Sequence, residues 1–329
     1  MIAPVKSHDG FTLVELMIAM AIAGIIVAAI FMTFTSQQKS QVTQQLVVDM
    51  QQNTRAALFM MQREIRMAGF DPTWDDGNDD GKDDNRISDG VDNDCDGQGD
   101  GDDPDNNEAN DIAGIVKAAP HQIQIRLDRD GNADFCSGDE LLAFGFPGVA
   151  DGNGDGIADA GAAQLKRGLG AAALNQPIAD DIHAVAFAYA FDFDAGAPTT
   201  DGELDTNGGN IIWGYDSNGN GEIDMALDTN NDGVINAGDD ANGDGFLNDS
   251  PLPNPAPVNS IRAIQMWILA RTRAPIRDYS DTTTYIVGNK IITPGDTDGN
   301  GTIDGSDATD SYKRNLLATT VKCRNMGLR

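Results

Sequence analysis

Aspartate and asparagine residues alternate around single glycines at several places in the chain, a spacing that could hold a hard divalent cation. A calcium-binding loop supplies oxygen ligands at alternate positions, turns sharply at a glycine in position six and usually closes with a carboxylate at position twelve. The stretch that begins at Asp228 meets all of these requirements, with Gly233 at the turn. Its expected ligands are Asp228, Asn230, Asp232, Val234, Asn236 and Asp239.

Two further stretches fit the same spacing of ligands and glycine, which we call the sequence frame, and we expect calcium in both. One turns at Gly301, and the other turns at Gly97 and contains Cys95. The expected ligands of the first are Asp296, Asp298, Asn300, Thr302, Asp304 and Asp307. Those of the second are Asp92, Asp94, Asp96, Asp100 and Asp103.

Four partial loops lack one part of the frame. Three have Leu227, Ala162 or Pro251 where the closing acid should stand, and the fourth lacks the glycine but is followed by Asp139. The three offer, in turn, Asp216, Asn218, Asn220 and Asp224; Asp151, Asn153, Asp155 and Asp159; and Asp240, Asn242 and Asp244. The fourth offers Asp128, Asp130, Asn132 and Asp134. A turn without metal explains each of these four equally well.

The ligand chemistry selects the ion. Oxygen donors without clusters of His or Cys exclude zinc as the main metal, and flexible loops favour calcium over magnesium. Closely spaced carboxylates repel unless a cation lies between them. We therefore expect that removal of calcium by a chelator partly disorders the domain that carries these loops. The loops between 216 and 249 leave no room for EF-hand helices and resemble those of dockerins and thrombospondin-type repeats.

The composition limits the partners of the chain. It has 52 Asp and Glu against 22 Lys and Arg, and this net charge of −30 repels nucleic acid and anionic lipid. The three histidines are scattered, and no catalytic triad or nucleotide-binding motif is present. We therefore expect no enzyme activity, no nucleic acid partner and no small-molecule substrate. Cys95, Cys136 and Cys323 permit one internal disulfide at most, with three possible pairings.

The N-terminal region carries a second distinctive pattern. A polar stretch, residues 1–10, precedes the apolar run 11–34, in which Glu15 is the one charged residue. The run is long enough to span a bilayer, and Lys6 before it favours a cytoplasmic N-terminus. A secretory signal is cleaved after its apolar run rather than before it, and a plain anchor leaves a costly carboxylate unexplained.

Gly10-Phe11-Thr12-Leu13-Val14-Glu15 resembles the processing signal of type IV prepilins and of type II secretion pseudopilins. The resemblance implies that a prepilin peptidase cleaves after Gly10 and methylates the new N-terminus, Phe11. It also implies that Glu15 neutralises the N-terminal ammonium of a neighbouring subunit. Such pairing makes physical sense, because each charge alone is expensive in hydrocarbon.

The apolar run continues into an amphipathic segment, residues 35–69. Apolar residues recur here at intervals near three and four, as on one face of a helix, and no proline interrupts 11–69. We expect one helix of about 58 residues, roughly 87 Å long, which ends before Asp71-Pro72. Its first half should lie in the membrane or filament core, and its second half should pack under a sheet.

The rest of the chain, residues 70–329, is expected to form a β-rich head. Alternating patterns predict strands at 122–127, 140–146, 182–193, 261–271 and 316–324. Alanine-rich stretches predict short helices at 113–119 and 160–174. The acidic insertions lie at about 75–111, 128–139, 151–162, 201–250 and 296–307. A long helix on an antiparallel sheet is an α+β arrangement.

A wider resemblance is to minor pilins of the PilW type, and it covers about a third of the chain. It is carried by QQNTRAALFMMQREIRMAGFDP, SIRAIQMWILARTRAPIRDYSDTTTYIVG and SYKRNLLATTVKCRN. The resemblance implies a type IV pilin fold and a role, with other minor pilins, in starting pilus assembly.

Three functions are compatible with these features. The first is a minor pilin in a type IV pilus, stabilised by calcium in its extracellular head. The alternatives are a J-type pseudopilin of type II secretion and a calcium-dependent adhesin displayed on a pilin stalk. Expected partners are other pilin and minor pilin subunits, the prepilin peptidase, and the inner membrane before assembly. The expected destination is an extracellular pilus or a periplasmic pseudopilus.

Overall fold

The computed structural model describes most of the chain. The described residues are 11–70, 114–130, 140–170, 173–193, 202–295 and 310–323. The chain divides into two compact units, Met1–Val48 and Asp49–Arg329, and we call the second the head.

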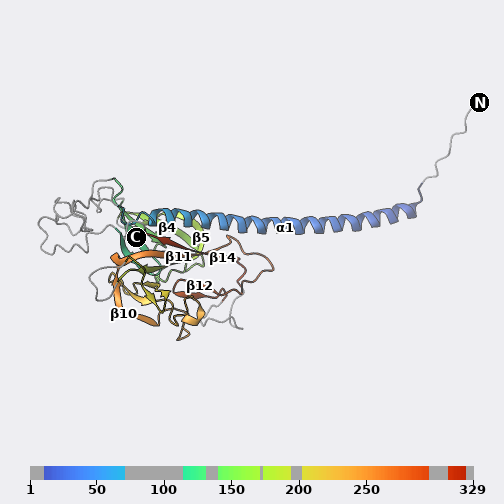
Figure 1. The fold of residues 1–329 in the computed structure, drawn as a ribbon. Coiled ribbons are helices and arrows are strands. Elements are labelled where there is room, and N and C mark those ends of the chain that lie inside the picture. Colours follow the sequence, from blue (N-terminus) through green and yellow to red (C-terminus); the bar gives the residue numbers. More distant parts are fainter. Residues whose placement is uncertain are drawn as a thin grey trace, which may run out of the picture. The chain divides into compact units, whose positions relative to one another are not determined.

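A single helix, α1 (Leu13–Ile65), supplies most of the first unit and continues into the head (Figure 1). Its 53 residues correspond to about 80 Å at 1.5 Å per residue. The helix ends four residues before the predicted boundary, where the main chain tightens into i to i−3 hydrogen bonds. Gly69 follows with a φ of 72°, a conformation that glycine adopts without steric cost. Its N–H donates to the Arg126 carbonyl, which ties the helix exit to the sheet.

The head is built on a 10-stranded antiparallel sheet. One path through it runs β1 (Ile115–Ala118), β2 (Ile123–Arg126), β3 (Leu141–Gly145), β4 (Ala163–Leu169), β5 (Leu174–Phe191), β8 (Gly214–Tyr215), β9 (Glu222–Ala226) and β10 (Ser250–Pro257). The order forks at β5, which also pairs with β11 (Ile261–Arg271), and β11 pairs in turn with β14 (Arg314–Lys322).

Two small hairpins form separate sheets. They are β6 (Thr206–Asn207) with β7 (Asn210–Ile211), and β12 (Tyr285–Val287) with β13 (Lys290–Ile292). Two single-turn 3₁₀ helices, η1 (Ala237–Asp239) and η2 (Val258–Ser260), complete the described elements. The α+β fold predicted from the sequence is therefore confirmed.

The centre of the head is the β5–β11 pair. Residues 182–191 of β5 are all buried, so this part of the strand is covered on both faces. The register places Phe187 opposite Met266 and Tyr189 opposite Ile264. The buried Tyr189 hydroxyl donates to the Ala119 carbonyl at 3.0 Å, which satisfies its polar atom. The strands predicted from alternating patterns lie where expected, although β5 begins eight residues earlier than predicted.

The two short helices predicted at 113–119 and 160–174 are wrong. The first stretch contains β1, which pairs with β2, and the second contains β4, which lies between β3 and β5. Their alanine content favours helix, but a short segment gains more from pairing with strands on a half-buried surface than from local propensity.

The second half of α1 packs on the sheet, as predicted. Its buried side chains within the head are Met50, Thr54, Ala57, Met61, Glu64 and Ile65. Their spacing of three, four and seven residues forms one helical stripe.

Polar contacts fix that stripe to three strands. The Glu64 carboxylate meets the Arg167 guanidinium of β4 at 2.7 Å, and both side chains are 9% exposed. Gln62 donates to the Thr319 hydroxyl of β14 at 2.6 Å, and Asn53 donates to a main-chain carbonyl of β5 at 2.8 Å. A buried ion pair is costly to break because the remaining charge stays desolvated. A shift of the helix along the sheet would therefore separate Glu64 from Arg167 and leave a buried charge without its partner.

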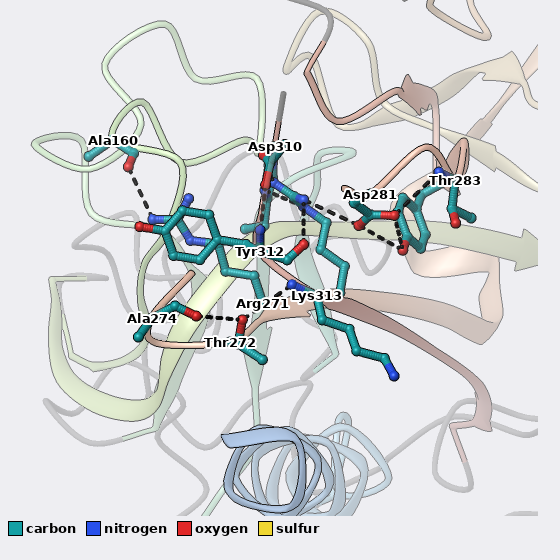
Figure 2. Close-up of polar contacts among 12 residues, drawn as sticks. Ala160, Arg271, Thr272, Ala274, Asp281, Thr283, Asp310, Tyr312 and Lys313 are labelled. Carbon is teal, nitrogen blue, oxygen red and sulfur yellow. Dashed lines mark hydrogen bonds and ion pairs between the residues drawn. The ribbon is translucent and has the colours of Figure 1, made fainter. Parts of the chain in front are cut away.

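A buried arginine joins the start of β14 to the rest of the head. The Arg314 side chain is 1% exposed and forms ion pairs with Asp281 at 3.3 Å and with Asp310 at 2.5 Å. Figure 2 shows that these two carboxylates approach from different segments. Arg314 Nε donates to His183 Nδ1 of β5 at 3.0 Å, and the Tyr285 hydroxyl donates to Asp281 at 3.1 Å. The cluster thus links β5, β12 and β14 through one cation.

A second arginine, Arg271, makes contacts near the start of β14. Arg271, at the end of β11, lies 4.2 Å from the centre of the Tyr312 ring and donates to the Ala160 carbonyl at 3.4 Å (Figure 2). Stacking of this kind keeps the guanidinium in place without burying its full charge.

His183 should make the stability of the head depend on pH. Burial, followed by the positive charge of Arg314, lowers the pKa of His183 to about 3, against about 6.5 in an unfolded chain. Its contribution is therefore complete above pH 6.5 and is lost as the pH falls toward 3, because the unfolded chain alone takes up a proton. Over pH 6 to 5 the slope should approach about 1.4 kcal/mol per pH unit.

The measurement is urea unfolding of the detergent-solubilised protein at several pH values. The His183→Gln variant keeps a hydrogen-bond acceptor for Arg314 but cannot titrate, so its stability should change less over this range. Parallel curves for the two proteins would contradict the assignment.

Candidate functional sites in the N-terminal helix and the acidic loops

The first candidate site is the start of α1. The Thr12 main-chain N–H and its hydroxyl both donate to Glu15 Oε2 at 2.9 Å, and the Glu15 N–H donates to the Thr12 hydroxyl at 3.3 Å. This reciprocal arrangement is a capping box, which satisfies main-chain donors at a helix start. Phe11 is 89% exposed, and Gly10 lies outside the described residues. Within the described part of the chain, the Glu15 carboxylate bonds to Thr12 alone.

The helix beyond this cap presents a large apolar surface. Every side chain from Phe11 to Phe34 is exposed. Among the described residues, α1 is the one helix long and apolar enough to cross a membrane. Contiguous apolar exposure on this scale marks a surface that is covered by lipid or by protein.

The second candidate site is a set of four acidic loops with a common pattern of hydrogen bonds. In each loop the first aspartate accepts from the N–H of the glycine five residues later. The pairs are Asp151–Gly156 at 2.8 Å, Asp216–Gly221 at 2.9 Å, Asp228–Gly233 at 2.8 Å and Asp240–Gly245 at 2.9 Å. These glycines have φ values of 81° to 84°, which other residues rarely adopt.

The third and fifth side chains of each loop repeat a shorter bond. Each accepts from the main-chain N–H two residues later, at 2.7 to 3.2 Å. They are Asn153 and Asp155, Asn218 and Asn220, Asn230 and Asp232, and Asn242 and Asp244. The alternating oxygens predicted as ligands therefore line one short turn in all four loops.

The loops differ in how they close. Asp239 accepts from the Thr229 N–H at 3.0 Å, at the twelfth position that the sequence frame requires. Asp159 and Asp224 do the same from the ninth position, each at 2.8 Å. Asp249 closes the last loop from the tenth position at 3.1 Å, and the sequence frame missed it. A search for an acid at positions nine to twelve would have found it.

Other predicted ligands have local partners or lie elsewhere. Asn236 accepts from the Gly238 N–H at 2.7 Å and donates to the Val234 carbonyl at 2.9 Å, so these two predicted ligands contact one another. The loops predicted at 92–103 and 296–307 lie outside the described residues.

One group of carboxylates converges closely. Asp128, Asp130 and Glu140 each place an oxygen within 4.8 Å of the others, which is close enough to share a metal ion. It is the one such group of His, Cys, Asp or Glu in the described part of the chain, and the acids of the four loops are less tightly gathered. The sequence predicted Asp128 and Asp130 but missed Glu140. Asn132, Asp134 and Asp139 lie outside the described residues.

The donors at all these places are oxygen atoms, which suits calcium better than zinc. The cysteines offer no alternative metal site in the described residues. Cys323 is a buried free thiol whose pKa is raised to about 12 by burial, whereas Cys95 and Cys136 lie outside the described residues.

Two family models match the chain. Residues 5–31 match the prokaryotic N-terminal methylation motif. Residues 158–325, about half of the chain, match the Type IV Pilus-assembly protein W model. The chain belongs to the PilW family. It is therefore a minor pilin of the type IV class, and the resemblance inferred from sequence is confirmed.

The PilW match covers β4 to β14 and includes Arg167, Arg314 and the loops between 216 and 249. The methylation motif and the apolar helix identify a single-pass anchor in the inner membrane, with the head outside the cytoplasm. PilW proteins and pilins are structural subunits, in keeping with the expectation of no enzyme activity.

Comparisons with individual proteins add little to this assignment. No curated protein matches the chain. One similar solved structure is the Type IV-like pilin TTHA1219 from Thermus thermophilus, with a TM-score of 0.35 and 12% sequence identity. The alignment covers 84% of this chain and 97% of that one.

The loop glycines provide a matched test of this geometry. At Gly221 a Cβ would meet nothing within 4 Å, whereas at Gly156 it would lie 2.7 Å from both His121 Cβ and the Val185 carbonyl oxygen. Both have positive φ values, so Gly221→Ala should cost about 1–2 kcal/mol through backbone strain. Gly156→Ala should cost clearly more, because a steric clash adds to the same strain.

Urea unfolding of both variants measures the difference. Equal losses of stability would contradict the close contact between His121 and the loop that begins at Asp151.

Proposed function

We propose that this PilW-family protein takes part in the initiation of type IV pilus assembly, and that α1 carries it from the inner membrane into the filament. The supporting observation is that the methylation motif coincides with an apolar helix surface that is exposed along its whole length. Lipid can cover this surface before assembly, and the helices of other pilin subunits can cover it afterwards. The transfer requires no new fold, because only the surroundings of the helix change.

In this proposal, prepilin peptidase cleaves after Gly10 and methylates the amine of Phe11. The new ammonium then belongs to the residue directly before Thr12, which forms the cap together with Glu15. The carboxylate of Glu15 pairs with the ammonium of an adjacent subunit, since each charge is expensive alone in an apolar filament core. Thr12 holds the carboxylate at the helix start until that partner arrives.

We further propose that calcium stabilises the head. The four described loops combine side-chain oxygens at alternate positions with a glycine turn, as calcium loops do. The convergent group of Asp128, Asp130 and Glu140 offers a fifth place. The ligands of the loops would be those predicted from sequence, with Asp159, Asp224, Asp239 and Asp249 as closing carboxylates. A bound ion would relieve the repulsion among these acids.

The match to a pilus-assembly family favours a pilus over a secretion pseudopilus. A J-type pseudopilin has the same N-terminal chemistry, so the helix does not distinguish the two machines. The PilW match lies within the head, outside the N-terminal segment that the two classes share.

Glu15 should be required for assembly but not for membrane insertion. Glu15→Gln retains the size of the side chain and an acceptor for Thr12 but cannot form the ion pair. We expect at least about a tenfold loss of the protein from sheared pili, because breaking a buried ion pair costs several kcal/mol. Glu15→Asp, which keeps the charge, should lose less.

Immunoblots of the sheared-pilus and membrane fractions from cells that make the protein measure both steps. The amount in the membrane should stay unchanged. Equal incorporation of Glu15→Gln and the wild type would refute the proposed pairing.

Calcium should raise the thermal stability of the head. A ligand at one hundred times its Kd adds about 2.7 kcal/mol per site, and magnesium at the same concentration should add less. Asp228→Asn should reduce the calcium-induced increase in Tm. Asp278→Asn, an exposed aspartate outside the loops, serves as the control.

Calorimetry with calcium, with magnesium and with excess chelator provides the measurement. An identical Tm under all three conditions would exclude a stabilising role for calcium.

A further inference from the structure

A cavity of about 320 Å³ lies in the head beside the loop that begins at Asp228. Its walls come from the β6–β7 hairpin and the residues that follow it, from residues 226–231, and from the start of β10. This volume is at the lower end of the range for small-molecule pockets. All three walls lie within the PilW match and outside the N-terminal helix that serves in assembly.

The hairpin wall rests directly on the acidic loop. Asn210 Nδ2, in β7, donates to the Asn231 carbonyl at 2.9 Å. The fit is close, because a Cβ at Gly233 would lie 2.8 Å from Asn210 Oδ1 and a Cβ at Gly208 would lie 2.9 Å from Asn231 Nδ2. Two glycines therefore permit the contact that closes one side of the cavity.

The lining combines polar and apolar side chains in equal number and is almost uncharged. Asp228 is the one ionisable residue in it, and its two oxygens already accept from the N–H groups of Asp232 and Gly233. Thr206, Asn207 and Ser250 add hydroxyl and amide groups. Within the described part of the chain, no hydrogen bond occupies these three side chains. An anionic ligand finds no cation here to balance its charge.

An aromatic ring complements these polar groups. Trp213 is half-buried and is one of the residues that line the cavity. Pro251 and Pro253 supply further apolar surface from β10. A ligand that matches this lining must present hydroxyl groups on its edges and an apolar face, at the size of one or two six-membered rings. Neutral saccharides have this combination of groups.

We propose that this cavity binds a neutral saccharide, with the ring face against Trp213 and the hydroxyl groups toward Asn207 and its polar neighbours. The site would give the head a ligand outside the filament. It does not depend on the proposed role in assembly, since a protein that failed to enter the pilus would retain the cavity.

Isothermal titration of the full-length protein tests the proposal, in calcium and in a detergent without a sugar headgroup. The probes are maltose, cellobiose, lactose and diacetylchitobiose, with 3′-sialyllactose as the anionic comparison. At least one neutral disaccharide should bind saturably, and 3′-sialyllactose should bind more weakly than lactose. Trp213→Ala should weaken binding of the best probe at least about tenfold.

A matched pair of exposed asparagines controls for general effects on the fold. Asn207→Ala, in the cavity, should weaken binding several-fold, whereas Asn248→Ala, on the surface of a neighbouring loop, should leave it unchanged. The proposal is overturned if none of the four neutral probes binds, or if the best probe binds wild type and Asn207→Ala equally.

Discussion

The uncovered apolar surface on the first half of α1 is the constraint on which the rest of the molecule depends. The apolar surface from Phe11 to Phe34 is uncovered by the rest of the described chain. Such a surface is unstable in water, so it must lie in lipid or among other helices. This requirement explains why the single acid of the segment is placed at the helix start. There, Thr12 and the positive end of the helix dipole stabilise Glu15.

The head must hold the second half of the same helix firmly enough to follow it. The buried pair of Glu64 and Arg167 sets the position of α1 on β4, and apolar side chains fill the stripe around it. Arg314 links β14 to β5 through His183, and to the segment before β12 through Asp281. The described acidic loops, between 151 and 159 and between 216 and 249, thus connect elements that are fixed by buried polar contacts as well as by the sheet.

The sequence predicted the long helix, the central strands and the first six positions of each described loop, because these depend on local spacing. It failed where pairing with other strands, or an acid outside the expected loop positions, decides the outcome. Ile115–Ala118 and Ala163–Leu169 are strands because neighbouring strands pair with them, despite their alanine content. Glu140 joins Asp128 and Asp130 across a hairpin, and Asp249 closes a loop from an unexpected position. Alternation within one segment does not reveal strand pairing, and a closing acid required at position twelve alone does not find these two carboxylates.

The hydrogen bond between Asn210 and Asn231 joins the proposed calcium loop to the proposed saccharide cavity. The loop that would hold an ion is also one wall of the cavity. Binding of calcium at the loop would therefore change the affinity of the cavity for the proposed saccharide. Thermodynamic linkage makes that effect reciprocal: if the ion tightens saccharide binding by some factor, the saccharide tightens ion binding by the same factor. If calcium tightens saccharide binding, the head would hold its ligand in calcium-rich surroundings and release it more readily in calcium-poor ones.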